Sequence, residues 1–467
     1  MVRAGGENKM KTLRLDQTRA APLAAIARWA SCAALAAVAG VSVANAGIAD
    51  HVKRSKVAGV DLITYPMGAQ DVVTIEGAFP AGDYFAEHGG GNPAIATLAG
   101  MMLDKGTTKH DKFAIAKELD DVGASVEFDV ATQTVAVRGK ALKKDVGRVV
   151  QIMAEELREP AFSADEFAKV KKQFAGRMRS ALENTNFRVH EAYLLSIYPQ
   201  GHPNRPVALQ EFLAAADRAS LEEVKAFYKK YYGPAHLTLI FVGDVDNKAI
   251  QAAVAKAFAG WTGGVEAVRS ASKAELSAPA QDRVPIPGKT SVSMALGQPT
   301  GLRYSDPDAL ALRVGTAVLG SGFTGRLMST VRDKEGLTYG ISANLGDDEF
   351  VDGTWTVSAT FAPELLAKGV SSTRRELDKW WEGGITAEEL AQRKTNLIGT
   401  YEVSLSTTTG MASAMLLTLE RGKPLTWLDD LPKAINALTV QQVNSAIRKY
   451  VDPKKMVLVE AGTFQEK

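Results

Sequence analysis

Two groups of residues in this chain have types and spacings that could support chemistry. Gly320, Gly322 and Gly325 form a G-x-G-x-x-G pattern, which in a dinucleotide-binding turn aims backbone N–H groups at a pyrophosphate. Arg332 and Tyr339 follow, seven residues apart. An arginine offers a planar fork of donors to a carbonyl oxygen or a developing oxyanion, and a tyrosine hydroxyl adds a neutral donor. The stretch therefore leaves two alternatives, a nucleotide site and a pair of groups directed at a peptide.

The residues before the glycines argue against a nucleotide site. A dinucleotide turn follows a strand, whereas Asp306-Pro-Asp308 is typical of a helix N-terminus, and Leu310, Val314 and Val318 recur at helical spacing. The run His88-Gly-Gly-Gly91 is similar to the oxyanion loop of some esterases, but the chain has no G-x-S-x-G element to supply a nucleophile. Both nucleotide binding and esterase chemistry are therefore disfavoured.

Histidine and cysteine provide neither a metal site nor a nucleophile by their spacing. The run His190-Glu191 begins an H-E-x-x-H zinc motif, but Leu194 stands where the second histidine is required. Cys32 is the single cysteine and lies in a segment that we expect to be removed, which excludes disulfides and thiolate chemistry from the mature chain. The six histidines, none of which is paired with another at i,i+4, are His51, His88, His110, His190, His202 and His236.

The first 46 residues have the features of an export signal. A stretch with basic residues such as Lys11 and Arg14 precedes an apolar run at 32–43, and Ala44-Asn-Ala46 matches an A-x-A cleavage site. The run is too short to span a bilayer well, and no other stretch is long enough. We expect a signal peptide at 1–46, with a membrane anchor as the alternative. The mature protein is then predicted to be periplasmic in a Gram-negative bacterium, without a stable membrane span.

Removal of this segment changes the net charge of the chain. The full sequence has 55 basic and 53 acidic residues. The segment holds six basic and two acidic residues, which leaves 49 and 51 and a net charge of −2. Binding to nucleic acid through bulk positive charge is therefore excluded.

The mature chain contains an internal repeat. Capping boxes, in which an N-cap hydroxyl and a third-position side chain satisfy each other's backbone donors, begin helices at Ser163 and at Thr386. A second pair begins at Ser220 and Thr439, offset by 219 residues, and the prolines that follow have the same offset. The repeat predicts two homologous α+β domains, each a mostly antiparallel sheet with helices packed on one face.

The repeat and the composition set the expected domain boundaries. The first domain is predicted at 47–262 and the second, which carries Arg332 and Tyr339, at 288–467. Residues 263–287, rich in Gly, Ala, Ser and Pro, are predicted to be a linker. Periodicity in the first domain predicts helices at 93–103, 113–122, 145–157, 164–182, 221–232 and 248–258, and strands at 57–65, 72–79, 125–130, 133–139 and 237–242.

The helix that ends before Lys105-Gly-Thr107 and the run from Arg332 to Tyr339 carry a resemblance to a known family. Both halves resemble the duplicated domains of the pitrilysin/insulinase zinc metallopeptidases, which include the mitochondrial processing peptidases. The resemblance extends over about residues 50–465. In catalytic members, an H-x-x-E-H motif on that helix binds zinc and polarises a water molecule, and a downstream glutamate completes the ligand set.

This chain departs from the family pattern at each zinc position. Aligned on Lys105-Gly-Thr107, Thr97, Gly100 and Met101 stand where the histidine, glutamate and histidine belong. The downstream ligand position falls near Arg177. The resemblance therefore implies a degenerate metal site and no catalytic zinc in this chain.

The Arg332 and Tyr339 pair is retained. In the family, an arginine and a tyrosine at this spacing in the second domain contact substrate or stabilise the transition state. From spacing alone the alternative is a surface arginine paired with Asp333 or Glu335 and a tyrosine in the core. The first-domain counterpart of this pair has neither group.

The resemblance also implies a partner. Bacterial relatives occur as split pairs, in which one subunit carries the zinc motif and the other the arginine and tyrosine. It implies that this chain is the non-catalytic subunit of a periplasmic heterodimeric zinc peptidase. Zinc is then expected on the partner subunit, and an unfolded peptide could add as a strand to an exposed sheet edge. The alternatives are a peptide-binding or scaffolding protein without a link to proteolysis, and a self-sufficient peptidase with a displaced metal site.

Overall fold

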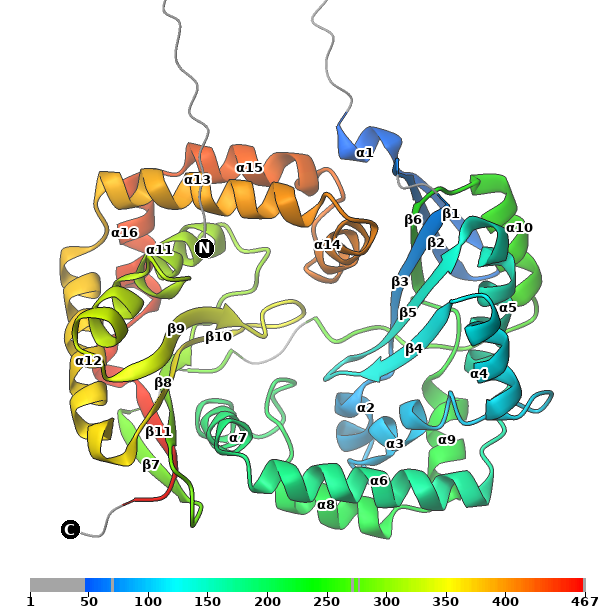
Figure 1. Ribbon diagram of the computed structural model, residues 1–467, viewed down its shortest axis with the longest axis horizontal. Coiled ribbons are helices and arrows are strands. Elements are labelled where there is room, and N and C mark those ends of the chain that lie inside the picture. Colours follow the sequence, from blue (N-terminus) through cyan, green and yellow to red (C-terminus); the bar gives the residue numbers. More distant parts are fainter. Residues whose placement is uncertain (1–46, 69–70, 270–272, 276–277, 465–467) are drawn as a thin grey trace, which may run out of the picture. The chain divides into compact units, whose positions relative to one another are not determined.

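The fold is built on two β-sheets, one from each half of the chain (Figure 1). The computed structural model describes residues 47–68, 71–269, 273–275 and 278–464. The expected signal peptide, residues 1–46, lies outside the described residues. All of the described residues belong to one structural unit, Ala46–Lys467. None of the helices in the described ranges is long and apolar enough to cross a membrane.

The two sheets share one strand topology. Within the described residues the first sheet has the order β1-β2-β6-β3-β5-β4 and the second the order β7-β11-β8-β10-β9. Neighbouring strands are antiparallel except for one parallel pair in each sheet, β2–β6 in the first and β7–β11 in the second. The five strands of the second sheet thus have the same arrangement as the five strands of the first sheet that remain when β1 is left out. This shared arrangement confirms two α+β halves. The strands are β1 (Lys53–Val57), β2 (Val60–Pro66), β3 (Val72–Pro80), β4 (Ser125–Val130), β5 (Thr134–Leu142), β6 (Thr238–Gly243), β7 (Ala280–Pro285), β8 (Val292–Pro299), β9 (Thr338–Gly346), β10 (Thr354–Phe361) and β11 (Val457–Gly462).

One face of each sheet packs against helices from its own half. Residues of α3, α5 and α9 share a hydrophobic core with β3 and β5, and residues of α11, α12 and α16 share one with β8 and β10. In α5 the buried residues Val149, Val150, Met153 and Leu157 recur at helical spacing, which gives the helix one apolar face. The first-half helices are α1 (Ile48–His51), α2 (Asp83–His88), α3 (Ile95–Met101), α4 (Lys112–Asp121), α5 (Val146–Arg158), α6 (Ala164–Leu182), α7 (Thr185–Ile197), α8 (Leu209–Arg218), α9 (Leu221–Tyr231) and α10 (Asn247–Ala257). The second-half helices are α11 (Ala309–Gly320), η2 (Met328–Lys334), α12 (Leu366–Gly383), α13 (Ala387–Ser404), α14 (Thr408–Glu420), α15 (Trp427–Ala437) and α16 (Val440–Tyr450).

The opposite face of the second sheet is covered in part by α7, a helix of the first half (Figure 1). The side chain of Asn184 caps this helix by accepting hydrogen bonds from the backbone of residues 186 and 187. Tyr193 of α7 is fully buried. Its hydroxyl lies 2.5 Å from Thr354 Oγ1 and donates a hydrogen bond to the carbonyl oxygen of Trp355 at 3.0 Å. Gly297 faces the same hydroxyl, and a Cβ at this position would overlap it. The second sheet is therefore shaped to accept a helix of the first half.

The first sheet receives α14 from the second half in the same way (Figure 1). Met411 and Met415 of α14 share a hydrophobic cluster with Ile63, Ile240 and other residues of the first sheet. The helix and the sheet are also joined by a buried hydrogen bond of 2.8 Å between the hydroxyls of Thr408 and Thr74. The predicted capping box at Ser163 is incomplete: its hydroxyl accepts from the amide of Glu166, but the Glu166 carboxylate pairs with Lys112 and Lys169. Since α7 and α14 each follow a long helix that an N-cap hydroxyl begins, the two halves exchange equivalent helices.

Two of the predicted segments have a different structure, and helices α2, α7 and α8 of the first half were not predicted. The predicted strand at 57–65 is a hairpin, because Ala58 and Gly59 adopt positive φ angles of 48° and 85° and reverse the chain between β1 and β2. Strand β7 lies inside residues 263–287, the predicted linker. It forms because it pairs in parallel with β11, and Arg283 of β7 bonds to buried Glu460 at 2.8 Å. Its mostly exposed side chains gave no apolar alternation to indicate a strand.

We expect Tyr193→Phe to lower the free energy of unfolding by about 1–2 kcal/mol, because the variant removes a buried hydroxyl that bridges α7 to the second sheet. Tyr339→Phe is the matched control, because its ring is 95% exposed. The control should change the free energy of unfolding by less than about 0.5 kcal/mol. Urea denaturation of both variants measures the difference. Equal changes in the free energy of unfolding would show that the hydroxyl of Tyr193 does not stabilise the packing of α7 on the second sheet.

A buried carboxyl on α5 makes stability depend on pH. Glu156 is 2% exposed, and its Oε2 has no hydrogen-bond partner among the described residues. Burial raises the pKa of Glu156 from 4.5 to about 8, with a further increase from the nearby carboxylate of Asp104. The folded chain therefore holds a proton that the unfolded chain releases above pH 4.5. This group lowers stability progressively as the pH rises from about 4.5 to 8.

We predict that Glu156→Gln stabilises the protein, by an amount that grows as the pH rises between about 4.5 and 8, because the amide cannot ionise. Thermal unfolding over this pH range provides the measurement, with Glu364→Gln on the exposed surface as the control. A gain that is constant with pH would contradict the assignment of a raised pKa to Glu156.

Candidate functional site

The glycine turn follows a helix and serves packing. Helix α11 ends at Gly320, so the turn follows a helix and lacks the preceding strand of a dinucleotide-binding turn. Gly320 lies against the backbone of β9, where a Cβ would overlap the amide nitrogen of Ala343. Gly322 has a φ of +65°, which favours glycine. Close packing and turn geometry therefore account for these two glycines without a bound phosphate.

The turn leads into η2, a short π-type helix that carries Arg332. The helix ends at Lys334, Gly336 follows with a φ of +64°, and β9 begins two residues after this glycine. The guanidinium of Arg332 lies over the ring of Phe323, 5.0 Å from its centre. Within the described ranges its carboxylate contact is Asp333, at a long 3.9 Å, while Glu335 pairs with Arg375. Most of the donor fork of Arg332 is therefore available to a ligand.

Tyr339 is the most exposed large hydrophobic side chain in the described part of the second half, at 95%. It stands at the start of β9, and the described residues offer its hydroxyl no hydrogen bond. The alternative of a core tyrosine is therefore wrong. The aromatic ring of Phe323, at 70% exposure, is also presented to solvent on this surface. Exposed aromatic rings beside an arginine are typical of a binding surface.

Next to these residues a groove of about 550 Å³ lies on the face of the second sheet that α7 partly covers. Its floor is made of hydroxyl-bearing and small residues of β9 and β10. Phe323 and Met328 line one side, and Val189 and His190 of α7 line another. The floor residues include Ser342, Thr356, Ser358 and Thr360. Both halves of the chain therefore build this groove.

The groove borders a free sheet edge. Strand β9 is the last strand of the second sheet and pairs with β10 alone. Its core side packs against α11 and η2, and the amide of Ile341 donates a hydrogen bond to Sδ of Met328 at 3.5 Å, so this amide already has a partner. An edge strand of this kind can pair with an added strand through its unpaired backbone groups. The groove would then receive side chains of the added strand.

The residues at the degenerate zinc positions do not fit a metal. Thr97, Gly100 and Met101 lie on α3, and Arg177 is exposed on α6. A Cβ on Gly100 would overlap Cγ2 of Val130, so the space for a glutamate side chain is filled by β4. The described residues contain no group of three or more His, Cys, Asp or Glu side chains that could hold a metal ion.

Sequence reasoning missed two polar groups beside these positions. Thr97 donates a hydrogen bond to Asp83 at 2.7 Å, and burial raises the pKa of Asp83 to about 7 despite this bond. The hydroxyl of Tyr232 is buried there without a partner among the described residues. The spacing of Asp83 from α3 gave no signal, because α2 and α3 are brought together only by the fold.

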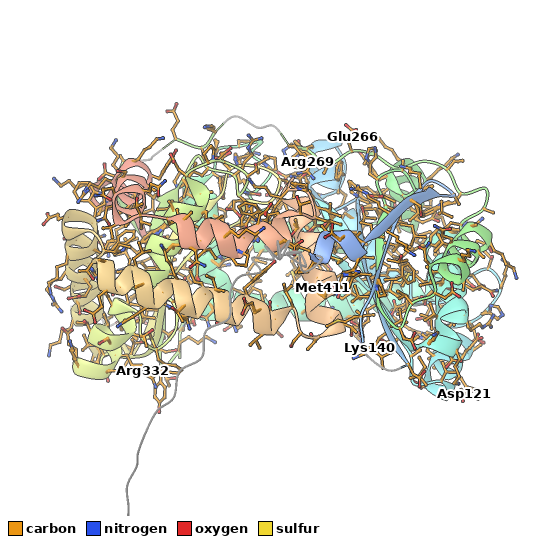
Figure 2. The ribbon with its side chains drawn as sticks, turned by 90° about the horizontal axis from the view of Figure 1, so that it is seen from above. Asp121, Lys140, Glu266, Arg269, Arg332 and Met411 are labelled. Carbon is orange, nitrogen blue, oxygen red and sulfur yellow. The ribbon has the colours of Figure 1, made fainter. Side chains whose placement is uncertain are left out.

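A larger cavity, of about 990 Å³, lies elsewhere. It is lined by residues of the first sheet, by α14 and by residues 266–269. Two of its charged groups already have partners: Arg54 bonds to Asp61 at 2.6 Å and 2.8 Å, and Arg269 donates to the backbone of Glu420. Figure 2 shows Glu266 and Arg269 together near one surface and Arg332 at the opposite one. This cavity is therefore separate from the Arg332 groove.

Comparisons with known proteins identify the family to which the chain is similar. The family model for insulinase (peptidase family M16) matches residues 91–208, and that for the peptidase M16 inactive domain matches residues 218–397. An uncharacterised zinc protease of Streptomyces coelicolor is 24% identical over 74% of this chain and 76% of its own length. The non-peptidase homolog YmxG of Helicobacter pylori is 21% identical over 77% and 82%.

Solved structures show the same fold. The crystal structure of a peptidase M16 inactive domain from Pseudomonas fluorescens has a TM-score of 0.80 at 23% identity, with 89% of this chain and 98% of that chain covered. Two adjacent models of one family together span most of residues 91–397, and the side chains that a catalytic member needs are missing from α3. The chain therefore belongs to the insulinase family of peptidases, peptidase family M16, as an inactive, peptidase-like member.

Proposed function

We propose that this chain is the substrate-binding, non-catalytic subunit of a heterodimeric zinc peptidase. The observation that carries the proposal is the groove lined by Phe323, next to which lie Arg332, whose carboxylate contact with Asp333 is long at 3.9 Å, and a strand, β9, that pairs on one side only and begins with the 95% exposed Tyr339. An unfolded peptide pairs with the edge of β9, while Arg332 and Tyr339 donate hydrogen bonds to its carbonyl oxygens. Zinc and its activated water reside on a partner subunit of the same family.

The filled space beside Gly100 supports a model in which one chain binds the substrate and a second chain binds zinc. Because Val130 fills the space next to Gly100, this chain supplies no room for the glutamate that polarises a zinc-bound water. The zinc ion and the activated water must then be supplied by another molecule. The features of residues 1–46 favour export, so we place the pair in the periplasm, with the first domain at 47–262 and the second at 288–467.

The alternative function is a peptide-binding or scaffolding protein that has no link to proteolysis. The filled zinc position is equally compatible with this function, and one relative is described as a non-peptidase homolog. The two functions differ in one outcome. Cleavage of a peptide by this chain mixed with a family member that retains H-x-x-E-H supports the peptidase subunit, whereas peptide binding without cleavage supports the alternative.

With such a partner present, we expect Arg332→Ala to lower kcat/KM by at least about tenfold, because a donor to the developing oxyanion is lost. Tyr339→Phe should lower it by a smaller factor, because only a neutral donor is removed. Lys334→Ala is the matched control, since Lys334 is exposed on the same short helix. Steady-state cleavage of a fluorogenic peptide gives these values. A kcat/KM that is unchanged in Arg332→Ala and Tyr339→Phe would remove the pair from the mechanism.

The filled zinc position gives a second prediction. Gly100→Ala should destabilise the chain by about 1–3 kcal/mol, because the new Cβ overlaps Val130. Adding Val130→Ala should recover part of this loss by making room. A double-mutant cycle by urea denaturation measures the coupling between the two positions. Strictly additive effects would mean that Val130 does not close the site.

A further inference from the structure

The groove beside Arg332 differs in charge from the equivalent surface of the first half. Pairing places Ala295, Ser358 and Ser342 in one row across β8, β10 and β9. In the first sheet the corresponding row across β3, β5 and β4 is Glu76, Arg138 and Glu127. Glu76 and Ala295 are 219 residues apart, the offset of the internal repeat. Where the row of the first half carries two carboxylates on either side of a guanidinium, the row in the groove therefore carries a methyl group and two hydroxyls.

The two rows occupy equivalent faces, because each lies next to the exchanged helix. Glu76 is within 3.4 Å of Ser413 of α14, and Ala295 packs with α7 residues such as Val189. The difference in charge is therefore a difference between matched positions. The row of the groove therefore has no charged side chain, at a surface where the equivalent row of the first half holds three.

The polar side chains that line the groove can all donate hydrogen bonds, and they include Asn186, whose Oδ1 already accepts one from Ser293 Oγ at 2.7 Å. Four hydroxyls line its floor, and the imidazole of His190 lines it from α7 with no hydrogen bond inside the described part of the chain. At the rim, Arg332 lies over Phe323, which itself lines the groove. Asp347 does not line the groove, and burial raises the pKa of its carboxyl, against a smaller lowering by the charge of His190.

These observations determine which side chain the groove would accept. A lysine or arginine would be desolvated there without a carboxylate partner, which is costly. A carboxylate would meet hydroxyl donors, an imidazole and a nearby guanidinium, and hydrogen bonds to charged groups are the stronger ones. A peptide strand paired with β9 places alternate side chains on the sheet face that forms the groove.

We infer that the groove is a specificity site for a carboxylate-bearing residue of the bound peptide. His190, from the first half, is the residue that binds this carboxylate. This inference rests on the proposed peptide-binding function and adds the class of side chain to it. The carboxylate comes either from an aspartate or glutamate side chain or from the carboxyl terminus of the peptide. His190 connects the exchange of α7 to substrate choice, since the first half supplies it to a groove of the second.

The test uses the mature chain and fluorescence anisotropy with labelled extended peptides. One peptide set carries Glu, Gln or Lys at a central position, and a second set ends in a free carboxylate or in an amide. We expect the wild type to bind a carboxylate peptide at least about tenfold more tightly than its amide counterpart, and the Lys peptide most weakly. A preference confined to the first set assigns the carboxylate to a side chain, and one confined to the second assigns it to the terminus.

His190→Gln should remove most of this preference while keeping affinity for the amide peptides. His236→Gln is the matched control, because this exposed histidine lines the separate larger cavity. Circular dichroism of both variants establishes that they fold. Equal affinity for carboxylate and amide peptides in the wild type would overturn the inference while leaving the proposed function intact. A preference that survives in His190→Gln would overturn the role of His190. Failure to bind any of the peptides would overturn the proposed function as well.

Discussion

The structure depends on the reciprocal exchange of α7 and α14 between the two halves. Each helix covers part of the sheet face that its own half cannot reach, and each contact is fixed by buried polar groups as well as by apolar packing. Tyr193 bonds into the second sheet, and Thr408 bonds into the first. Because an apolar sheet face must be buried, neither half is complete without the other. The exchange also places residues of one half in the groove of the other.

This constraint explains which parts of the fold the sequence predicted. Capping boxes, prolines and apolar periodicity are local signals, and they correctly predicted the repeat, the long helix from Ala164 to Leu182 and the helix before Gly320. Helix α7 was not predicted, because its buried face matches the sheet of the distant half and its apolar residues are mixed with polar ones. Strand β7 was missed for a related reason, since its partner β11 lies at the far end of the chain.

The candidate site shows the same limit. The types of the residues at 97, 100 and 101 predicted the lack of zinc ligands, but not that Val130 fills the space beside Gly100. The spacing of Arg332 and Tyr339 left a core tyrosine open, and only the structure shows that this ring is exposed. His190 was recognised only as a failed zinc motif. Its place in the groove follows from the exchange, which no local pattern encodes.

The central claim is that a peptide pairs with β9 beside Arg332. Hydrogen–deuterium exchange of the chain with and without a bound extended peptide tests it most directly, because pairing with an added strand protects the backbone amides of the sheet edge. The account predicts slower exchange in β9 and in the residues of α7 that line the groove, with no change in β4, the equivalent edge of the first sheet. Protection of β4 with none in β9 would contradict it.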